Sequence, residues 1–182
     1  MTEWAQLEDA RYSWRWGHGY GAARPLESVI LAGCNSRMKC LDLGCGNAVL
    51  SHGFKDYVGV DVSSLQRNVN KAGTPGRYHH ASLDDLSCLA GESFDVAVCN
   101  DTMEHIPPEH VDAVLASIAG VDAKLFVFNV CCRDSSSRGP DGETLHPTIQ
   151  PPAWWLAKLG EYFTVEVLKR EPDRLICKGT KP

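Results

Sequence analysis

Three features are missing from the sequence, and each absence narrows what the protein can be. None of the eight cysteines forms a C-x-x-C pair, so we expect reduced thiols that pack in strands as small apolar groups. No stretch approaches the roughly 20 apolar residues of a membrane helix. The first 16 residues also lack the apolar core of a secretory signal. We therefore expect a soluble, cytoplasmic protein with no membrane partner.

An excess of basic residues is missing too. The formal net charge is −5 and the sequence pI is about 5.8, which disfavours a nucleic-acid partner bound by phosphate neutralisation. The length of 182 residues predicts one domain with a single core.

The most informative stretch lacks a third glycine. Residues 39–51 read KCLDLGCGNAVLS, an apolar run followed by a loop with Gly44 and Gly46. This pattern predicts a buried parallel strand, a tight turn that approaches a ligand, and a helix beginning between Asn47 and Ser51. A loop that binds a dinucleotide needs the motif G-x-G-x-x-G. In this sequence Val49 occupies the position of the third glycine, so a pyrophosphate ligand is disfavoured.

A carboxylate, Asp42, precedes the loop, and a second, Asp61, ends the next predicted strand 19 residues later. S-adenosylmethionine (SAM) carries a sulfonium, an amino group and no phosphate, so it suits such a loop. Here the sequence resembles class I SAM-dependent methyltransferases, whose first motif is an acid followed by G-x-G-x-G, with Ala48 in place of the last glycine. The resemblance implies that Asp61 accepts hydrogen bonds from the ribose hydroxyls.

The resemblance implies SAM as cofactor and a set of residues that contact it. Residues 82–84 lie where the family meets the adenine ring, and either Ser82 or Asp84 binds its exocyclic amine. The expected cofactor residues are Asp42, Gly44, Cys45, Gly46, Asp61, Val62, Ser82, Leu83, Asp84 and Asn100.

The expected fold is a single α/β domain over residues 37–182 with a Rossmann-like, seven-stranded sheet, mostly parallel. Residues 163–171 and 174–180 are expected to form the C-terminal antiparallel hairpin that ends this sheet in the family. Residues 1–36 are rich in aromatics and either cap the cofactor, as in the family, or cover a sheet edge.

The second informative stretch, NDTMEHIPPEH, follows a predicted strand over residues 93–100. Val111, Val114, Leu115 and Ile118 recur at helical spacing after it, so Glu104 and His105 lie at the carboxyl end of a strand, where ligands of such sheets bind. His105 is the candidate general base, with a packing histidine as the alternative, and Glu104 can orient a substrate or pair with a metal.

The tract MEHIPPE resembles small-molecule methyltransferases, including ubiquinone-pathway, sugar and lipid enzymes, and not the N-P-P-Y of amino-methylating nucleic-acid enzymes. The loop over residues 131–150 is a predicted lid, and Arg133, His146 and Trp154 are candidate acceptor contacts. Adjacent His79 and His80 point to opposite faces of a strand, so no metal is expected there or assigned elsewhere.

The expected function is SAM-dependent methylation of a small-molecule acceptor at oxygen. Two alternatives stay open at this stage: a SAM-binding protein without catalysis, and an enzyme that methylates nucleotides or DNA bases.

Overall fold

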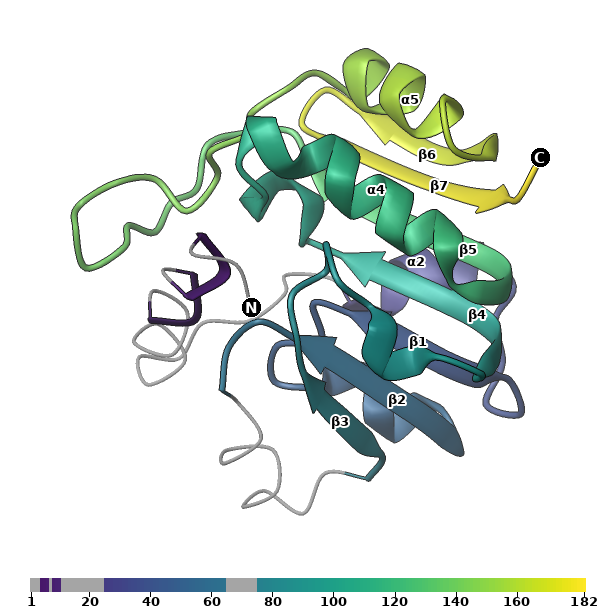
Figure 1. The fold of residues 1–182 in the computed structure, drawn as a ribbon. Helices are drawn as coiled ribbons and strands as arrows, with labels where there is room; N and C mark the ends of the chain where they lie inside the picture. Colours follow the sequence, from purple (N-terminus) through teal and green to yellow (C-terminus); the bar gives the residue numbers. More distant parts are fainter. Residues whose placement is uncertain (1–3, 7, 11–24, 65–74) are drawn as a thin grey trace.

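A seven-stranded sheet forms the centre of the computed structural model, which describes residues 4–6, 8–10, 25–64 and 75–182 (Figure 1). The strand order is β3-β2-β1-β4-β5-β7-β6; the first five strands are parallel, and β7 is antiparallel to both neighbours. The predicted fold class and C-terminal hairpin are therefore confirmed. The strands are β1 (Lys39–Leu43), β2 (Asp56–Asp61), β3 (Arg77–His80), β4 (Ser93–Asn100), β5 (Asp122–Cys131), β6 (Thr164–Glu171) and β7 (Arg174–Thr180).

Helices cover both faces of the sheet. In Figure 1, α4 and α5 lie on one face and α2 on the other. Among the described residues, no helix is long and apolar enough to cross a membrane. Within residues 25–64 and 75–182, the α-helices are α2 (Pro25–Leu31), α4 (Val111–Gly120) and α5 (Pro152–Gly160), and the short 3₁₀ helices are η1 (Val49–Gly53), η2 (Ser87–Leu89), η3 (Met103–His105) and η4 (Pro108–His110). Residues 4–6 and 8–10 are also helical.

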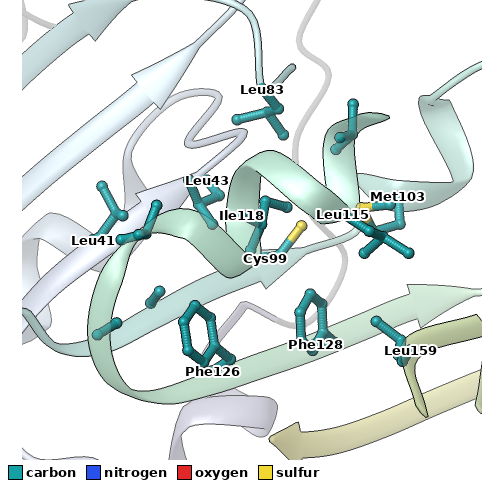
Figure 2. Packing of buried hydrophobic residues seen from close by; sticks show 14 of the residues in the cluster. Leu41, Leu43, Leu83, Cys99, Met103, Leu115, Ile118, Phe126, Phe128 and Leu159 are labelled. Carbon is teal, nitrogen blue, oxygen red and sulfur yellow. The ribbon is translucent and has the colours of Figure 1, made fainter. Parts of the chain in front are cut away.

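The two-residue period of the strands divides the apolar side chains between two cores. Leu41 of β1 faces α4 and packs in one cluster with Leu115 and Ile118 (Figure 2). Its neighbour Cys40 faces the other side and packs with Val29 of α2. Because successive side chains of a strand point to opposite faces, a central strand buried on both faces must be apolar throughout.

The sequence pattern located most elements within a few residues. All four apolar positions expected on one face of α4 are buried. The helix expected to begin between Asn47 and Ser51 begins at Val49, but it is a short 3₁₀ helix, and Ala48 before it adopts a left-handed φ of 55°. Residues 132–151 contain no helix or ladder strand, as expected of the lid, and only an isolated bridge joins Arg138 to Thr144. The sequence also predicts a loop over residues 14–21 and a helix over residues 63–73. These segments lie wholly or largely outside the described residues.

The topology places a crevice between β1 and β4. The chain runs from β1 outward to β2 and β3, then returns to continue on the other side with β4 and β5. The connections therefore diverge at the carboxyl ends of β1 and β4, which is where open α/β sheets bind their ligands.

Leu115→Ala should lower the free energy of unfolding by about 2–5 kcal/mol, because Leu115 is fully buried and the cavity left behind cannot close completely. Urea denaturation measures the effect. Leu26→Ala is the matched control, since Leu26 is 49% exposed, and it should cost less than about 1 kcal/mol. Equal losses in the two variants would contradict the assignment of this core.

Candidate active site

The loop after β1 depends on its two glycines. Gly44 and Gly46 have φ angles of 77° and 51°, which side chains disfavour. A Cβ atom on Gly44 would lie 2.4 Å from Cγ2 of Thr102. The amides of Gly44 and Cys45 donate to the carbonyl of Val60 at 2.8 and 3.1 Å, which ties the loop to the end of β2.

Asp61 ends β2 and receives three hydrogen bonds. Its Oδ2 accepts from the Gly46 amide at 2.8 Å, and its Oδ1 accepts from the Ser63 amide and hydroxyl at 2.8 and 2.6 Å. Burial raises the pKa of Asp61, whereas these bonds act to lower it. Each carboxylate oxygen has two lone pairs, so capacity for a ligand hydroxyl remains.

A cleft with about 770 Å³ of empty space, including solvent at its mouth, opens beside this loop. Three carboxylates, Glu8, Asp61 and Asp101, line it, and the described lining contains no lysine or arginine. The cleft therefore suits a ligand with hydroxyl or cationic groups better than a phosphate. Its lining is Trp4, Glu8, Gly44, Cys45, Gly46, Asn47, Asp61, Val62, Leu83, Asn100, Asp101, Thr102, His105 and Ile106.

The residues after β4 are held rigidly against the cleft. Asn100 accepts a hydrogen bond from the Ser28 hydroxyl at 2.6 Å. Asp101 adopts a positive φ of 45°, a strained conformation that the surroundings must hold in place. Nη1 of Arg174 lies 2.7 Å from an oxygen of Asp101 and 2.7 Å from Oδ1 of Asn129, so β5 and β7 supply that support.

Asp42 is buried behind the loop and does not line the cleft. The Tyr57 hydroxyl donates to its Oδ2 at 2.6 Å. Burial raises the pKa of Asp42 to about 7, against the lowering effect of Tyr57, and the negative charge of Asp61 adds to the rise. Near neutral pH this carboxyl group is therefore partly protonated. Because Asp42 does not line the cleft, any effect that it has on a ligand passes through the loop.

Glu104 and His105 belong to η3, and both are buried. Nδ1 of His105 lies 2.6 Å from the carbonyl of Leu145. A carbonyl only accepts, so this nitrogen carries the hydrogen and Nε2 of the neutral ring carries the lone pair. Burial lowers the pKa of His105 to about 3, helped by His146 nearby, and burial raises the pKa of Glu104 well above its usual range.

The predicted lid packs on η3 along part of its length. The Thr148 amide donates to the carbonyl of Glu104 at 3.2 Å, and the His105 and His146 rings meet edge to face with centroids 4.7 Å apart. Arg133 pairs instead with Asp173 at 3.3 Å on the surface.

The two adjacent tryptophans of α5 have different surroundings. Trp155 is fully buried in the core, while half-buried Trp154 packs against it edge to face, with the Lys158 ammonium 6.0 Å from the Trp154 ring centroid. Neither tryptophan lines the cleft.

Trp4 of the N-terminal segment contacts η4 and the residues after β3. The Trp4 ring stacks on His110 with centroids 4.7 Å apart, and its Nε1 donates to Oδ2 of Asp84 at 3.2 Å. Trp4 and Glu8 both line the cleft, in agreement with a cap formed by the start of the chain. The division into a cap over residues 1–36 and a domain over 37–182 stays a prediction.

The structure brings most predicted cofactor residues together at the cleft, namely Gly44, Cys45, Gly46, Asp61, Val62, Leu83 and Asn100, together with the candidate base His105. Other candidates lie outside its lining, and their roles stay predictions: Asp42, Ser82, Asp84, Glu104, Arg133, His146 and Trp154. Sequence reasoning did not assign Glu8, Asn47, Asp101, Thr102 or Ile106. Asp101 and Thr102 directly follow a predicted strand end, which was a usable signal, whereas Glu8 had none.

The pH dependence of stability should report on Asp42. Its folded pKa of about 7 exceeds the ordinary value of 3.8, so between pH 4 and 7 the folded state holds a proton that the unfolded state has lost. The free energy of unfolding must then fall as pH rises, by at most about 1.4 kcal/mol per pH unit. From pH 5 to 7 the parent should lose about 2 kcal/mol relative to Asp42→Asn, as measured by urea denaturation. Parallel curves for the two proteins would contradict the shifted pKa.

Comparison with known proteins agrees with this geometry. A family model described as a methyltransferase domain matches residues 41–123, which run from β1 to the start of β5. The ubiquinone biosynthesis O-methyltransferase of Hahella chejuensis is 32% identical over 102 residues, which are 50% of this chain and 43% of that protein. The chain thus spans less than half the length of this relative.

Solved structures share the fold at low sequence identity. The DhpI complex with S-adenosylhomocysteine (SAH) has a TM-score of 0.68 at 17% identity and covers 97% of this chain and 91% of that chain. Magnesium protoporphyrin IX methyltransferase from Synechocystis PCC 6803, with bound SAH, has a TM-score of 0.66 at 15% identity. The match covers 98% of this chain and 99% of that chain. In its matched domain, its related sequences and its fold, the chain is similar to SAM-dependent methyltransferases.

Proposed function

We propose that this protein binds SAM in the cleft and transfers its methyl group to an oxygen atom of a small-molecule acceptor. The observation that carries the proposal is the chemistry of the lining: a glycine loop tied to Asp61, three carboxylates, and no lysine or arginine among the described lining residues. Such a site favours a sulfonium cation with ribose hydroxyls over a dinucleotide, whose pyrophosphate needs positive charge and a third glycine.

Each part of the cleft has a role toward SAM. Asp61 accepts from the ribose hydroxyls, and the Gly44–Gly46 loop lets the backbone approach the ligand. Leu83 packs against the adenine, with Trp4 closing that end beside Asp84. Asp101, whose Oδ2 is buried without a hydrogen-bond partner among the described residues, accepts from the SAM amino group. This arrangement follows from the positions of the acceptors and requires no movement of the sheet.

SAM supplies an electrophilic methyl group on sulfur, and the protein must place an acceptor oxygen in line with it. Positioning of this kind can supply a large part of the rate. His105 lines the cleft at the acceptor end and helps to hold the acceptor hydroxyl in place. With a pKa of about 3, His105 is a weak proton acceptor at neutral pH. Its main contribution is therefore to orient the hydroxyl, while the proton passes on to water.

The acceptor enters from the side of η3 and the loop over residues 131–150. Glu104 and His146 lie beside His105 there, and Arg133 and Trp154 lie on the same loop and the following helix. The ubiquinone biosynthesis O-methyltransferases support oxygen as the attacked atom and a small molecule as the partner. Nothing in the net charge of −5 favours a nucleic-acid acceptor.

Asp61→Ala should weaken SAM binding by about tenfold to more than a hundredfold, because hydrogen bonds between a carboxylate and the ribose hydroxyls contribute about 1.5–3 kcal/mol. Isothermal titration calorimetry measures the affinity. Asp56→Ala is the matched control, since Asp56 is exposed at the other end of β2, and it should bind like the parent. Unchanged affinity in a folded Asp61→Ala variant would reject the ribose contact, and no binding by the parent would reject the function.

His105→Ala should reduce methyl transfer by about tenfold to a hundredfold while SAM affinity changes by only a few-fold, because His105 orients the acceptor and not SAM. The assay incubates the protein with methyl-labelled SAM and a metabolite extract and detects labelled products by mass spectrometry. His52→Ala, at an exposed histidine of η1, serves as control. SAM binding without any labelled product would identify a non-catalytic binding protein, and equal turnover in His105→Ala would make His105 a packing residue.

A further inference from the structure

Glu104, His105 and His146 form a buried group of potential metal ligands, which we call the Glu104 cluster. One ligand atom from each lies within 4.8 Å of the other two. Glu104 and His105 come from η3 after β4, whereas His146 comes from the loop after β5. The fold therefore gathers two imidazoles and one carboxylate from two segments about 40 residues apart.

Both imidazoles are oriented through their Nδ1 atoms. His105 Nδ1 donates to the Leu145 carbonyl at 2.6 Å, and His146 Nδ1 donates to the Arg133 carbonyl at 2.7 Å. In each neutral ring the lone pair then belongs to Nε2. Histidines that bind metals are usually held in this manner, with the second nitrogen donating to a carbonyl or carboxylate that fixes the tautomer and the ring plane.

Glu104 provides an independent observation. Its side chain is fully buried, and its Oε1 accepts from the Cys131 amide at 3.2 Å. Its Oε2 is buried with no hydrogen-bond partner among the described residues. A buried acceptor left without a partner costs about 1–3 kcal/mol, and more if the group is charged. A bound cation would both satisfy this oxygen and neutralise the carboxylate.

We propose that the Glu104 cluster binds one divalent transition-metal ion of the Zn²⁺, Mn²⁺ or Fe²⁺ type. Imidazole ligands favour these ions over Mg²⁺ and Ca²⁺, which take mainly oxygen ligands. Bonds of about 2.0–2.2 Å place the ligands of a tetrahedral ion roughly 3.4 Å apart, so the widest separation must shrink by about 1.4 Å or less. Three protein ligands leave at least one coordination position open for water or another oxygen.

The open position gives the ion a role in acceptor binding, which rests on the proposed function. His105 is the one member of the cluster that lines the cleft among the described residues, so the ion lies in the wall of its acceptor end. An acceptor hydroxyl that binds the ion loses its proton to water more readily. The resulting oxygen anion forms the bond to the methyl carbon as the carbon–sulfur bond breaks, and that electron pair returns to sulfur.

Co²⁺ is the probe for the test, because its absorption spectrum distinguishes the possible ligands. Thiolates of the eight cysteines would give a charge-transfer band, whereas histidine and carboxylate ligands give none. The 182-residue chain is stripped with a chelator and titrated with Co²⁺ by absorption and calorimetry. The expected result is one ion per chain without a thiolate band. His146→Ala and Glu104→Gln should each lower the affinity for Co²⁺ by about tenfold to a hundredfold. His52→Ala, which alters a histidine outside the cluster, should bind like the parent.

Three results would each overturn the metal site. These are no binding of Co²⁺ by the parent, a thiolate band in its spectrum, and equal Co²⁺ affinity in the parent and in folded His146→Ala. If Glu104→Gln fails to fold, as judged by circular dichroism, His146→Ala decides the question. SAM calorimetry on the stripped protein separates this proposal from the function. SAM binding without Co²⁺ binding rejects only the metal site, and Co²⁺ binding without SAM binding rejects only the function.

Discussion

The hydrogen bond from the Gly46 amide to the Asp61 carboxylate is the contact on which the shape of the cleft depends. It spans 2.8 Å and joins the loop after β1 to the end of β2. The two ends are adjacent because β1 and β2 are parallel neighbours, with Leu43 paired to Val60. The bond holds the glycine loop open toward the cleft and fixes the carboxylate at its rim, so every other lining residue is placed relative to this corner.

Buried carboxylates surround that corner, and each is stabilised differently. Asp42 receives the Tyr57 hydroxyl and titrates near neutrality, whereas Asp101 pairs with Arg174. Glu104 has one oxygen bonded to a backbone amide and one with no partner among the described residues. Removing carboxylates from water is costly, so a fold that keeps several of them in one region is arranged for positive charge. The proposed sulfonium cofactor and the proposed metal ion would each supply that positive charge.

Much of the fold and the cofactor side of the cleft followed from local pattern. The apolar run before Gly44 predicted a buried strand, the helical spacing after Pro108 predicted α4, and Asp61 was recognised from its place at a strand end. These features are local because backbone conformation and burial impose a period of two or 3.6 residues on the sequence. The helix after the loop begins within the expected interval, but its 3₁₀ form and the left-handed turn at Ala48 leave no periodic signature.

The sequence by itself determined which strands are buried, and it predicted which loop approaches the cofactor and which acid faces the ribose. Only the tertiary structure decided that Asp42 withdraws behind the loop, that Glu8 reaches the cleft, and that His146 meets His105. The reason is physical. Periodicity records whether a side chain is buried, but it does not record which distant segment it is buried against. The bond between His105 and the Leu145 carbonyl spans 40 positions of chain, and it exists because β4 and β5 end side by side.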